Sequence, residues 1–315
     1  MNIPVFYNPK QIHRPNSVSR SPSKPAISAG LLVEDSAFEL HSNFNRAKIT
    51  DLAYAHTAKY LYDVCEFNIC DGFGEKSNEA VDAIFWTNGN FLAAVDYALE
   101  GKHPGVVWSL TSGFHHAHAD SGGGFCTFNA LAVAAIKAYE SFRGRTLVID
   151  EDAHLGDGFV SIMKDQEAPC AYMYSDYTHK SGMLSLKDFE AHVDRIISGF
   201  EPDLILYQAG ADNWKKDSLG AGKLSKKQLR KRDDIVFSAA REFGVPIVAN
   251  LAGGYALDFN DTIDIHMATG ESMKSIYLKP EEEGSSGTTT FLGRGRKDIQ
   301  AHRNTERNGR RAGSA

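Results

Sequence analysis

The stretch that decides the fold runs from residue 145 to residue 158 and reads R-T-L-V-I-D-E-D-A-H-L-G-D-G. Its first half, Thr146–Asp150, is a short run of apolar and β-branched residues, which is typical of a strand buried on both faces. Its second half is dense in carboxylates, carries a histidine and begins where the strand ends. Polar residues at the carboxyl end of a parallel strand indicate a ligand site at that edge of the sheet.

Three further strands of the same character are found along the chain. Residues 105–110 (GVVWSL), 203–207 (DLILY) and 246–250 (PIVAN) predict strands. Helical patterns separate them and cover residues 128–139, 186–198 and about 223–243. Strands that alternate with helices predict a parallel sheet with helices on both faces. The predicted fold class is therefore α/β.

Composition and charge limit the domain organisation and the partners. The 315 residues, 42% of them hydrophobic, can form a sizeable core, and we expect one domain over residues 1–292. Residues 293–315 form a basic tail with few apolar side chains, which predicts disorder or a weak contact with a polyanion. The tail carries about +5, which leaves about −11 on the rest of the chain. An acidic body argues against nucleic-acid binding and favours a cationic substrate.

The sequence also indicates a compartment. It contains no run of about 18 apolar residues, so we expect no membrane span. Its first thirty residues lack the continuous apolar segment of a secretory signal. The four cysteines, Cys65, Cys70, Cys126 and Cys170, form no C-x-x-C pair. We therefore expect reduced thiols and a cytoplasmic protein.

The polar cluster after Thr146–Asp150 favours a metal site. Asp150, Asp152 and His154 alternate along an extended chain, so their side chains share a face. Buried neighbouring carboxylates are costly unless a cation neutralises them. A divalent metal held by Asp152, His154 and a third ligand, Asp212 of the next strand end, would keep an open position for water. The alternative is an Asp-rich turn that caps the next helix, with Asp157 as its N-cap.

Histidines and a tyrosine follow two other strands. His115 and His116 come after residues 105–110, and an imidazole there could take a proton from water and return it to a leaving amine. Tyr255 follows the Gly253–Gly254 turn and could donate a hydrogen bond to a substrate carbonyl. A surface histidine patch and a packed core tyrosine are the alternatives for these residues taken singly.

Five motifs, in this order, resemble the histone deacetylase family, including its bacterial acetylpolyamine and acetoin-utilisation branches. They are H-H-A (115–117), G-F-C-x-x-N (124–129), D-x-D-x-H-x-G-D-G (150–158), G-A-D (210–212) and G-G-Y (253–255). The resemblance covers residues 105 to 255. It implies an arginase-like three-layer α/β/α fold with an eight-stranded, mainly parallel sheet.

The resemblance also implies roles for individual residues. Asp152, His154 and Asp212 match the ligands of one zinc ion, and a structural monovalent cation is compatible with the family. His116 matches the general base and acid, and His115 its electrostatic partner. Asp150 and Asp157 match carboxylates that orient the histidines, and Tyr255 matches the phenol that polarises the carbonyl. Gly124 and Phe125 match the amide-binding carbonyl and the aromatic wall of the acyl-lysine tunnel. Asp71 is the candidate for the acidic rim, and residues 172–177 for a second tunnel aromatic.

Three segments depart from the family pattern, and one of them is Asn250-Leu251-Ala252, which replaces the extra glycines before the tyrosine. Leu155 stands where many eukaryotic members have a second histidine, and T-S-G-F (111–114) precedes the histidine pair in place of the family's usual segments.

The expected activity is hydrolysis of an N-acetyl amide on a lysine side chain or a small amine, including an acetylpolyamine. Zinc suits the two carboxylates and the imidazole, and ferrous ion suits them too. A two-metal ureohydrolase and a catalytically silent acyl-amine binder are the alternatives. A homo-oligomer is compatible with the sequence.

Overall fold

The core of the protein is a sheet of seven parallel strands. The computed structural model describes residues 2–13, 20–66, 72, 74, 76–101, 105–164, 166–175, 185–220 and 222–278. The strands are β1 (Ile3–Phe6), β2 (Phe38–His41), β3 (Val106–Ser109), β4 (Thr146–Asp150), β5 (Cys170–Tyr174), β6 (Leu204–Gln208) and β7 (Ile247–Asn250). Their order across the sheet is β2-β1-β3-β7-β6-β4-β5. Every pairing between neighbouring strands is parallel.

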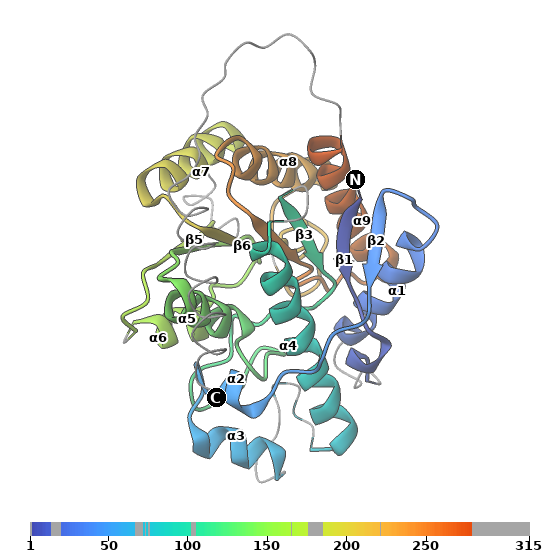
Figure 1. Ribbon diagram of the computed structural model, residues 1–315. Helices are drawn as coiled ribbons and strands as arrows, with labels where there is room; N and C mark the ends of the chain where they lie inside the picture. The colour runs from blue at the N-terminus through green and yellow to red at the C-terminus, as the bar shows by residue number, and fades with distance from the viewer. Residues whose placement is uncertain are drawn as a thin grey trace.

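Helices cover both faces of this sheet (Figure 1). One face packs against α2 (Ile49–Leu52), α3 (Ala58–Cys65), α4 (Asn78–Leu99), α5 (Ala130–Phe142) and α6 (Asp157–Met163). The other face packs against α1 (Lys24–Leu32), α7 (Leu186–Phe200), α8 (Lys226–Glu242) and α9 (Phe259–Tyr277). Two short 3-10 turns, η1 (Pro9–Gln11) and η2 (Ser21–Ser23), precede α1. The protein therefore has the three layers that the family resemblance implies.

Strand β4 shows why the short apolar runs form buried strands. All five of its residues are buried, and it pairs with β6 on one side and β5 on the other. Leu147 and Ile149 join the core beside α7 and α8, whereas Val148 joins the core beside α5. Because successive side chains point to opposite faces, a strand covered on both sides is apolar throughout.

The helices begin at residues that satisfy free backbone N–H groups. The side chain of Asn129 accepts a hydrogen bond from Ala132 N at the start of α5. Ser225 and Gln228 form a reciprocal capping box at the start of α8. These caps place the helix starts within two or three residues of the boundaries that the sequence predicts.

Some predictions are corrected or lie outside the described part of the chain. The described residues form seven strands, not the eight that the resemblance implies. Residue 157 is not the N-cap of the helix after β4; Gly156 occupies that position and Asp157 is the first helical residue. The predicted tail, 293–315, lies outside the described residues. Within those residues, no helix combines the length and apolar character that crossing a bilayer requires.

Candidate active site

The site lies at the carboxyl ends of four strands that are neighbours in the sheet. These strands occur in the order β3-β7-β6-β4, and the loop after each contributes polar residues. The β3 loop carries the histidine pair, the β4 loop carries Asp152 and His154, the β6 loop carries Asp212, and the β7 loop carries Tyr255. Ligand sites of open parallel sheets form at this edge.

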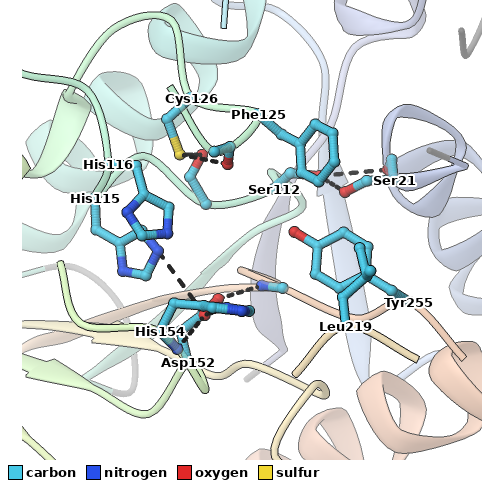
Figure 2. Close-up of a pocket in the computed structure, with 13 residues that line it drawn as sticks. Ser21, Ser112, His115, His116, Phe125, Cys126, Asp152, His154, Leu219 and Tyr255 are labelled. Atoms are coloured by element: carbon cyan, nitrogen blue, oxygen red, sulfur yellow. Dashed lines mark hydrogen bonds and ion pairs between the residues drawn. The ribbon is translucent and has the colours of Figure 1, made fainter. Parts of the chain in front are cut away.

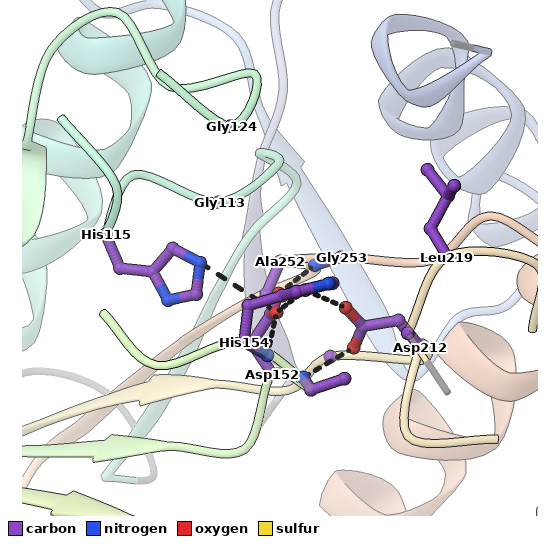
Figure 3. A network of polar contacts seen from close by, with 12 residues as sticks. Gly113, His115, Gly124, Asp152, His154, Asp212, Leu219, Ala252 and Gly253 are labelled. Atoms are coloured by element: carbon purple, nitrogen blue, oxygen red, sulfur yellow. Dashed lines mark hydrogen bonds and ion pairs between the residues drawn. The ribbon is translucent and has the colours of Figure 1, made fainter. Parts of the chain in front are cut away.

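Asp152, His154 and Asp212 form a three-residue group that could hold a metal ion. One ligand atom from each lies within 4.8 Å of the other two. The Nδ1 atom of His154 is 3.1 Å from Asp152 Oδ1 and 3.3 Å from Asp212 Oδ2. Figure 3 shows the three side chains turned toward one another. Two oxygen donors and one nitrogen donor form the kind of ligand set found in catalytic zinc sites.

The surroundings of the two carboxylates fit a bound cation. Asp212 is fully buried, and its Oδ2 atom has no hydrogen-bond partner among the described residues. A Cβ atom at position 253 would lie 2.3 Å from Asp212 Oδ2 and 2.6 Å from Asp152 Oδ2, so only glycine leaves the space between them open. The Gly253 N–H donates to Asp152 Oδ2 at 2.8 Å and fixes this carboxylate.

The pKa shifts of His154 and Asp212 also indicate that positive charge stabilises this site. Burial raises the pKa of Asp212 to about 7, and the Asp152 carboxylate adds to the effect. The hydrogen bond to Asp152 and the neighbouring Asp212 carboxylate, 3.3 Å away, raise the pKa of His154 to about 10. A proton on His154 would thus partly neutralise the pair in the metal-free protein, which is the role that a divalent cation fills more completely.

His115 is buried against a second carboxylate. Its Nδ1 atom is 2.8 Å from Asp150 Oδ2, and only 2% of the residue is exposed. Burial alone would lower the pKa of His115, but Asp150 and Asp152 outweigh it and raise this pKa to about 9. Asp150 is held in turn by Tyr172 Oη at 2.8 Å and Gln208 Nε2 at 3.2 Å.

His116 has a different environment, although it is adjacent in sequence. Its Nδ1 atom is 2.7 Å from Asp157 Oδ1. Burial and the neighbouring His115 ring lower the pKa of His116, and the Asp157 carboxylate only partly opposes this shift. The His116 ring lies 5.9 Å from the His154 ring, centroid to centroid. The two adjacent histidines therefore differ in their surroundings: carboxylates raise the pKa of His115, whereas burial and the His115 ring lower the pKa of His116.

A cavity of about 250 Å³ opens onto these groups (Figure 2). Its lining residues include His115, His116, Gly124, Phe125, Cys126, Asp152, His154, Gly253 and Tyr255. The Phe125 and Tyr255 rings face each other, with centroids 5.6 Å apart. In Figure 2 the phenol oxygen of Tyr255 points toward the side of the cavity where the histidines lie.

The backbone beside the cavity adopts conformations that are rare for residues with side chains. Gly124 has φ +52°, and a Cβ there would meet the His116 ring at 2.3 Å. Phe125 and Ala252 also have positive φ values, +65° and +52°. Such strain is maintained only where the surrounding structure requires it, and it is common at functional sites.

The comparison with known protein families agrees with this geometry. The family model described as "Histone deacetylase domain" matches residues 21–183 and 173–269, which is most of the chain. The chain belongs to the histone deacetylase family. The resemblance stated from the motifs is thereby confirmed, as is the expectation of an amide hydrolase.

Individual relatives of this family member are distant. An uncharacterized protein of Picosynechococcus sp. is 25% identical over 304 residues, which cover 88% of this chain and all of that protein. Histone deacetylase 2 of Arabidopsis thaliana is 31% identical over 48% of this chain and 44% of its own length. The acetoin utilization protein AcuC of Staphylococcus aureus is 29% identical over 42% of this chain and 41% of its own length. The chain thus matches less than half of the Arabidopsis and Staphylococcus proteins.

Solved structures confirm the fold of this family member. The HDA15 HD domain superposes with a TM-score of 0.71 at 17% identity, covering 96% of this chain and 95% of that domain. The acetylpolyamine aminohydrolase of Burkholderia pseudomallei superposes with a TM-score of 0.68 at 19% identity, covering 87% and 99%.

The structure brings all ten predicted site residues to this edge of the sheet. The second tunnel aromatic was expected within residues 172–177, and neither Tyr172 nor Tyr174, the described aromatic residues of that range, is among the lining residues of the cavity. Tyr172 does not line the cavity; its hydroxyl bonds Asp150 and its ring stacks on Phe159 at 5.4 Å. Asp71, the candidate for the acidic rim, and Tyr177 lie outside the described residues.

The sequence reasoning missed contributions from the N-terminal segment and the β3 loop. Ser21 and Ser112 line the cavity, with their hydroxyl oxygens 3.1 Å apart. Lys24 is fully buried, and its ammonium group donates to the Ala252 carbonyl. Ser21 and Lys24 lie far from every motif in sequence, so no spacing pattern indicated them.

Proposed function

We propose that this chain is a zinc-dependent deacetylase that hydrolyses N-acetyl amides of lysine side chains or small amines. The observation that carries the proposal is a single cavity lined by two metal-ligand candidates, the His115–His116 pair and the Tyr255 phenol. Asp212, the third ligand candidate, lies within 4.8 Å of the other two, measured between ligand atoms. Membership of the histone deacetylase family supports the same reaction.

In this proposal Asp152, His154 and Asp212 hold one zinc ion. When bound, zinc would polarise the acyl carbonyl and lower the pKa of a water molecule toward neutrality. Three protein ligands leave a position for water and substrate. Ferrous ion would suit the same donors, so metal identity is part of the proposal.

His116 is proposed as the general base and acid. Because Nδ1 is engaged by Asp157 at 2.7 Å, Nε2 is the atom left to take and return a proton. The lowered pKa of His116 keeps the ring neutral at pH 7, so it can accept a proton from the attacking water. It would then pass that proton to the leaving amine. His115, held cationic by Asp150, would stabilise negative charge that develops nearby.

Tyr255, Gly124 and Phe125 are proposed to bind the acyl amide. Burial raises the pKa of Tyr255 well above its usual value, so the phenol keeps its proton and can donate it to the substrate carbonyl oxygen. Phe125, whose ring lies beside that of Tyr255, would contact the aliphatic stem of an acyl-lysine. The Gly124 carbonyl would accept the substrate amide N–H.

A cytoplasmic location is proposed on the state of the cysteines. Cys65, Cys126 and Cys170 are free thiols in the described part of the chain. Unpaired cysteines are expected in a reducing compartment.

The proposal is tested with a panel of acetyl-lysine peptides and acetylated polyamines, assayed as purified and with added zinc. At least one of these substrates should be hydrolysed. Replacing His116 with Ala, or Tyr255 with Phe, should reduce kcat by about 100-fold or more while the protein still unfolds cooperatively. Unchanged rates in both variants would refute the assigned roles.

A further inference from the structure

The loop after β6 holds the backbone of Tyr255 on both sides. The Tyr255 N–H donates to Asp217 Oδ2 at 2.6 Å. The Ser218 hydroxyl donates to the Tyr255 carbonyl. An antiparallel bridge pairs Asp217 with Ala256 and aligns the two segments. Residues 217 and 218 thus bind both polar backbone groups of the tyrosine.

The same carboxylate shapes its own turn. Asp217 Oδ1 accepts hydrogen bonds from Leu219 N and Gly220 N, both at 2.9 Å. At the end of this turn Gly220 lies against the backbone of Asp212, where an added Cβ would come within 2.0 Å of the Asp212 carbonyl oxygen. One short turn therefore contacts a metal-ligand candidate at one end and Tyr255 at the other.

In the part of the chain that the structure describes, the Tyr255 side chain is held by ring packing and not by polar contacts. Within the described residues, its phenol oxygen makes no hydrogen bond. The ring contacts are with Phe125, at 5.6 Å between centroids, and with the Lys24 ammonium, at 5.7 Å from the ring centroid. The residue before it, Gly254, has φ +152°, a conformation that glycine leaves easily. The hydrogen bonds that hold Tyr255 in place are therefore those of its backbone.

Other contacts of the loop after β7 bind the backbone groups of residues next to Tyr255, but not the Tyr255 N–H. The Lys24 ammonium bonds the Ala252 carbonyl, and Ala211 N donates to the Gly253 carbonyl at 2.9 Å. Ala256 N donates to Thr262 Oγ1 at 3.2 Å. Asp217 is thus the side chain that restrains the Tyr255 N–H.

We propose that Asp217 is a positioning residue that fixes the Tyr255 phenol relative to the metal ligands, with Ser218 as its auxiliary. The inference rests on the proposed function, because the orientation of the phenol affects the rate only if Tyr255 takes part in catalysis. A displacement of about 1 Å in such a group can cost about 100-fold in rate.

The test is a double-mutant cycle on the full-length, metal-loaded protein. Asp217→Asn keeps one oxygen for the Leu219 and Gly220 N–H groups but turns an NH₂ group toward the Tyr255 N–H. In the native background we expect kcat on an acetyl-lysine peptide to fall about 10- to 100-fold. In the Tyr255→Phe background, the same substitution should change kcat by less than about 2-fold. Equal losses in both backgrounds would overturn the proposal.

A readout that does not need turnover accompanies the cycle. The NMR signal of Tyr255 in ring-labelled protein is assigned by its absence in Tyr255→Phe. It should shift in Asp217→Asn, and to a smaller extent in Ser218→Ala. It should stay in place in the control Asp264→Asn, which removes an exposed carboxylate that pairs with Lys226. A Tyr255 signal that is the same in Asp217→Asn and in the native protein contradicts the inference. If the native protein hydrolyses no acetylated substrate but the signal shifts, the proposed function fails and the positioning contact stands.

Discussion

His115 and His116 each form a hydrogen bond with one carboxylate, and the difference in burial of these two carboxylates gives the histidines different pKa shifts. Asp150 is buried with His115 and raises its pKa. Asp157 is more exposed and only partly opposes the lowering of the His116 pKa. His118 also approaches Asp157, with its Nε2 atom 3.5 Å from Oδ2. Small differences in burial thus separate a fixed charge from a titratable base.

The Asp157 contact predicts a shift in the pH dependence of catalysis. The carboxylate raises the pKa of His116, so Asp157→Asn should lower that pKa further and move the acidic limb of the kcat profile to lower pH. Losing the group that orients the ring should also reduce kcat by about 10- to 100-fold. The measurement is a full pH–rate profile, with His118→Gln as the control. A profile that keeps its acidic limb and its height in Asp157→Asn would contradict this role.

Lys24 predicts a pH dependence of stability. Burial lowers the pKa of its ammonium from 10.5 to about 8, although Asp212 and Asp152 partly oppose the shift. Between about pH 8 and 10.5 the native chain has released a proton that the unfolded chain still holds, so this group adds stability as pH rises. The unfolding free energy of the native protein, minus that of Lys24→Met, should increase by up to about 3 kcal/mol between pH 7.5 and 10. Urea unfolding of both proteins at the two pH values measures it; a pH-independent difference would contradict the assignment.

Among the elements, α5 connects its own cap to the histidine loop. Asn129 caps the helix through Oδ1, and its Nδ2 donates to the Ala117 carbonyl at 2.9 Å. The segment that carries His115 and His116 is therefore fixed to the first turn of a buried helix.

Two substitutions separate these functions of Asn129. Asn129→Ser keeps an acceptor for the cap and removes the amide N–H that reaches the Ala117 carbonyl, so it should destabilise the protein by about 1–3 kcal/mol through that unsatisfied carbonyl. Asn129→Ala also removes the cap and should cost about 1 kcal/mol more. Chemical denaturation measures both. Equal stability of the two variants would show that the cap contributes nothing.

The elements that could be predicted are those with a simple periodic pattern. Strands β3, β4, β6 and β7 are continuous apolar runs that are covered on both faces. Strand β2 was not predicted because it is only partly buried and alternates irregularly. Helix α4 was not predicted because Asn88, Gly89 and Asn90 interrupt its apolar face. Asn90 is buried there because its side chain bonds the Phe6 carbonyl and Ser109. Tertiary contacts of this kind leave no local signal.

Site residues could be predicted from the sequence where they come directly after a predicted strand. Asp152 and His154 directly follow β4, so sheet geometry alone places them together. Lys24 and Asp217 act through backbone groups of residues 252 and 255, and a backbone contact imposes no recognisable residue spacing. The sequence narrows the second tunnel aromatic only to residues 172–177, because the direction of a side chain such as Tyr172, whose hydroxyl bonds Asp150, depends on tertiary contacts.

At the scale of the whole molecule, metal binding by the ligand candidates should stabilise the native state. Asp152 and Asp212 come from loops after β4 and β6, so a bound ion would connect two strand ends. Zinc at 100 times its Kd should stabilise the native state by about 2.7 kcal/mol and raise the Tm. In Asp212→Asn the zinc-dependent rise in Tm should be absent or much smaller. The same rise in both proteins would place the ion elsewhere.

The most direct test of the account is turnover of an acetyl-lysine peptide before and after metal removal, with bound metal counted per chain. We predict one zinc or ferrous ion per chain in the active protein. Activity should be lost when that ion is removed by a chelator and recovered when stoichiometric zinc is returned. Full activity in protein rigorously freed of metal would contradict the central claim that Asp152, His154 and Asp212 form a catalytic metal site.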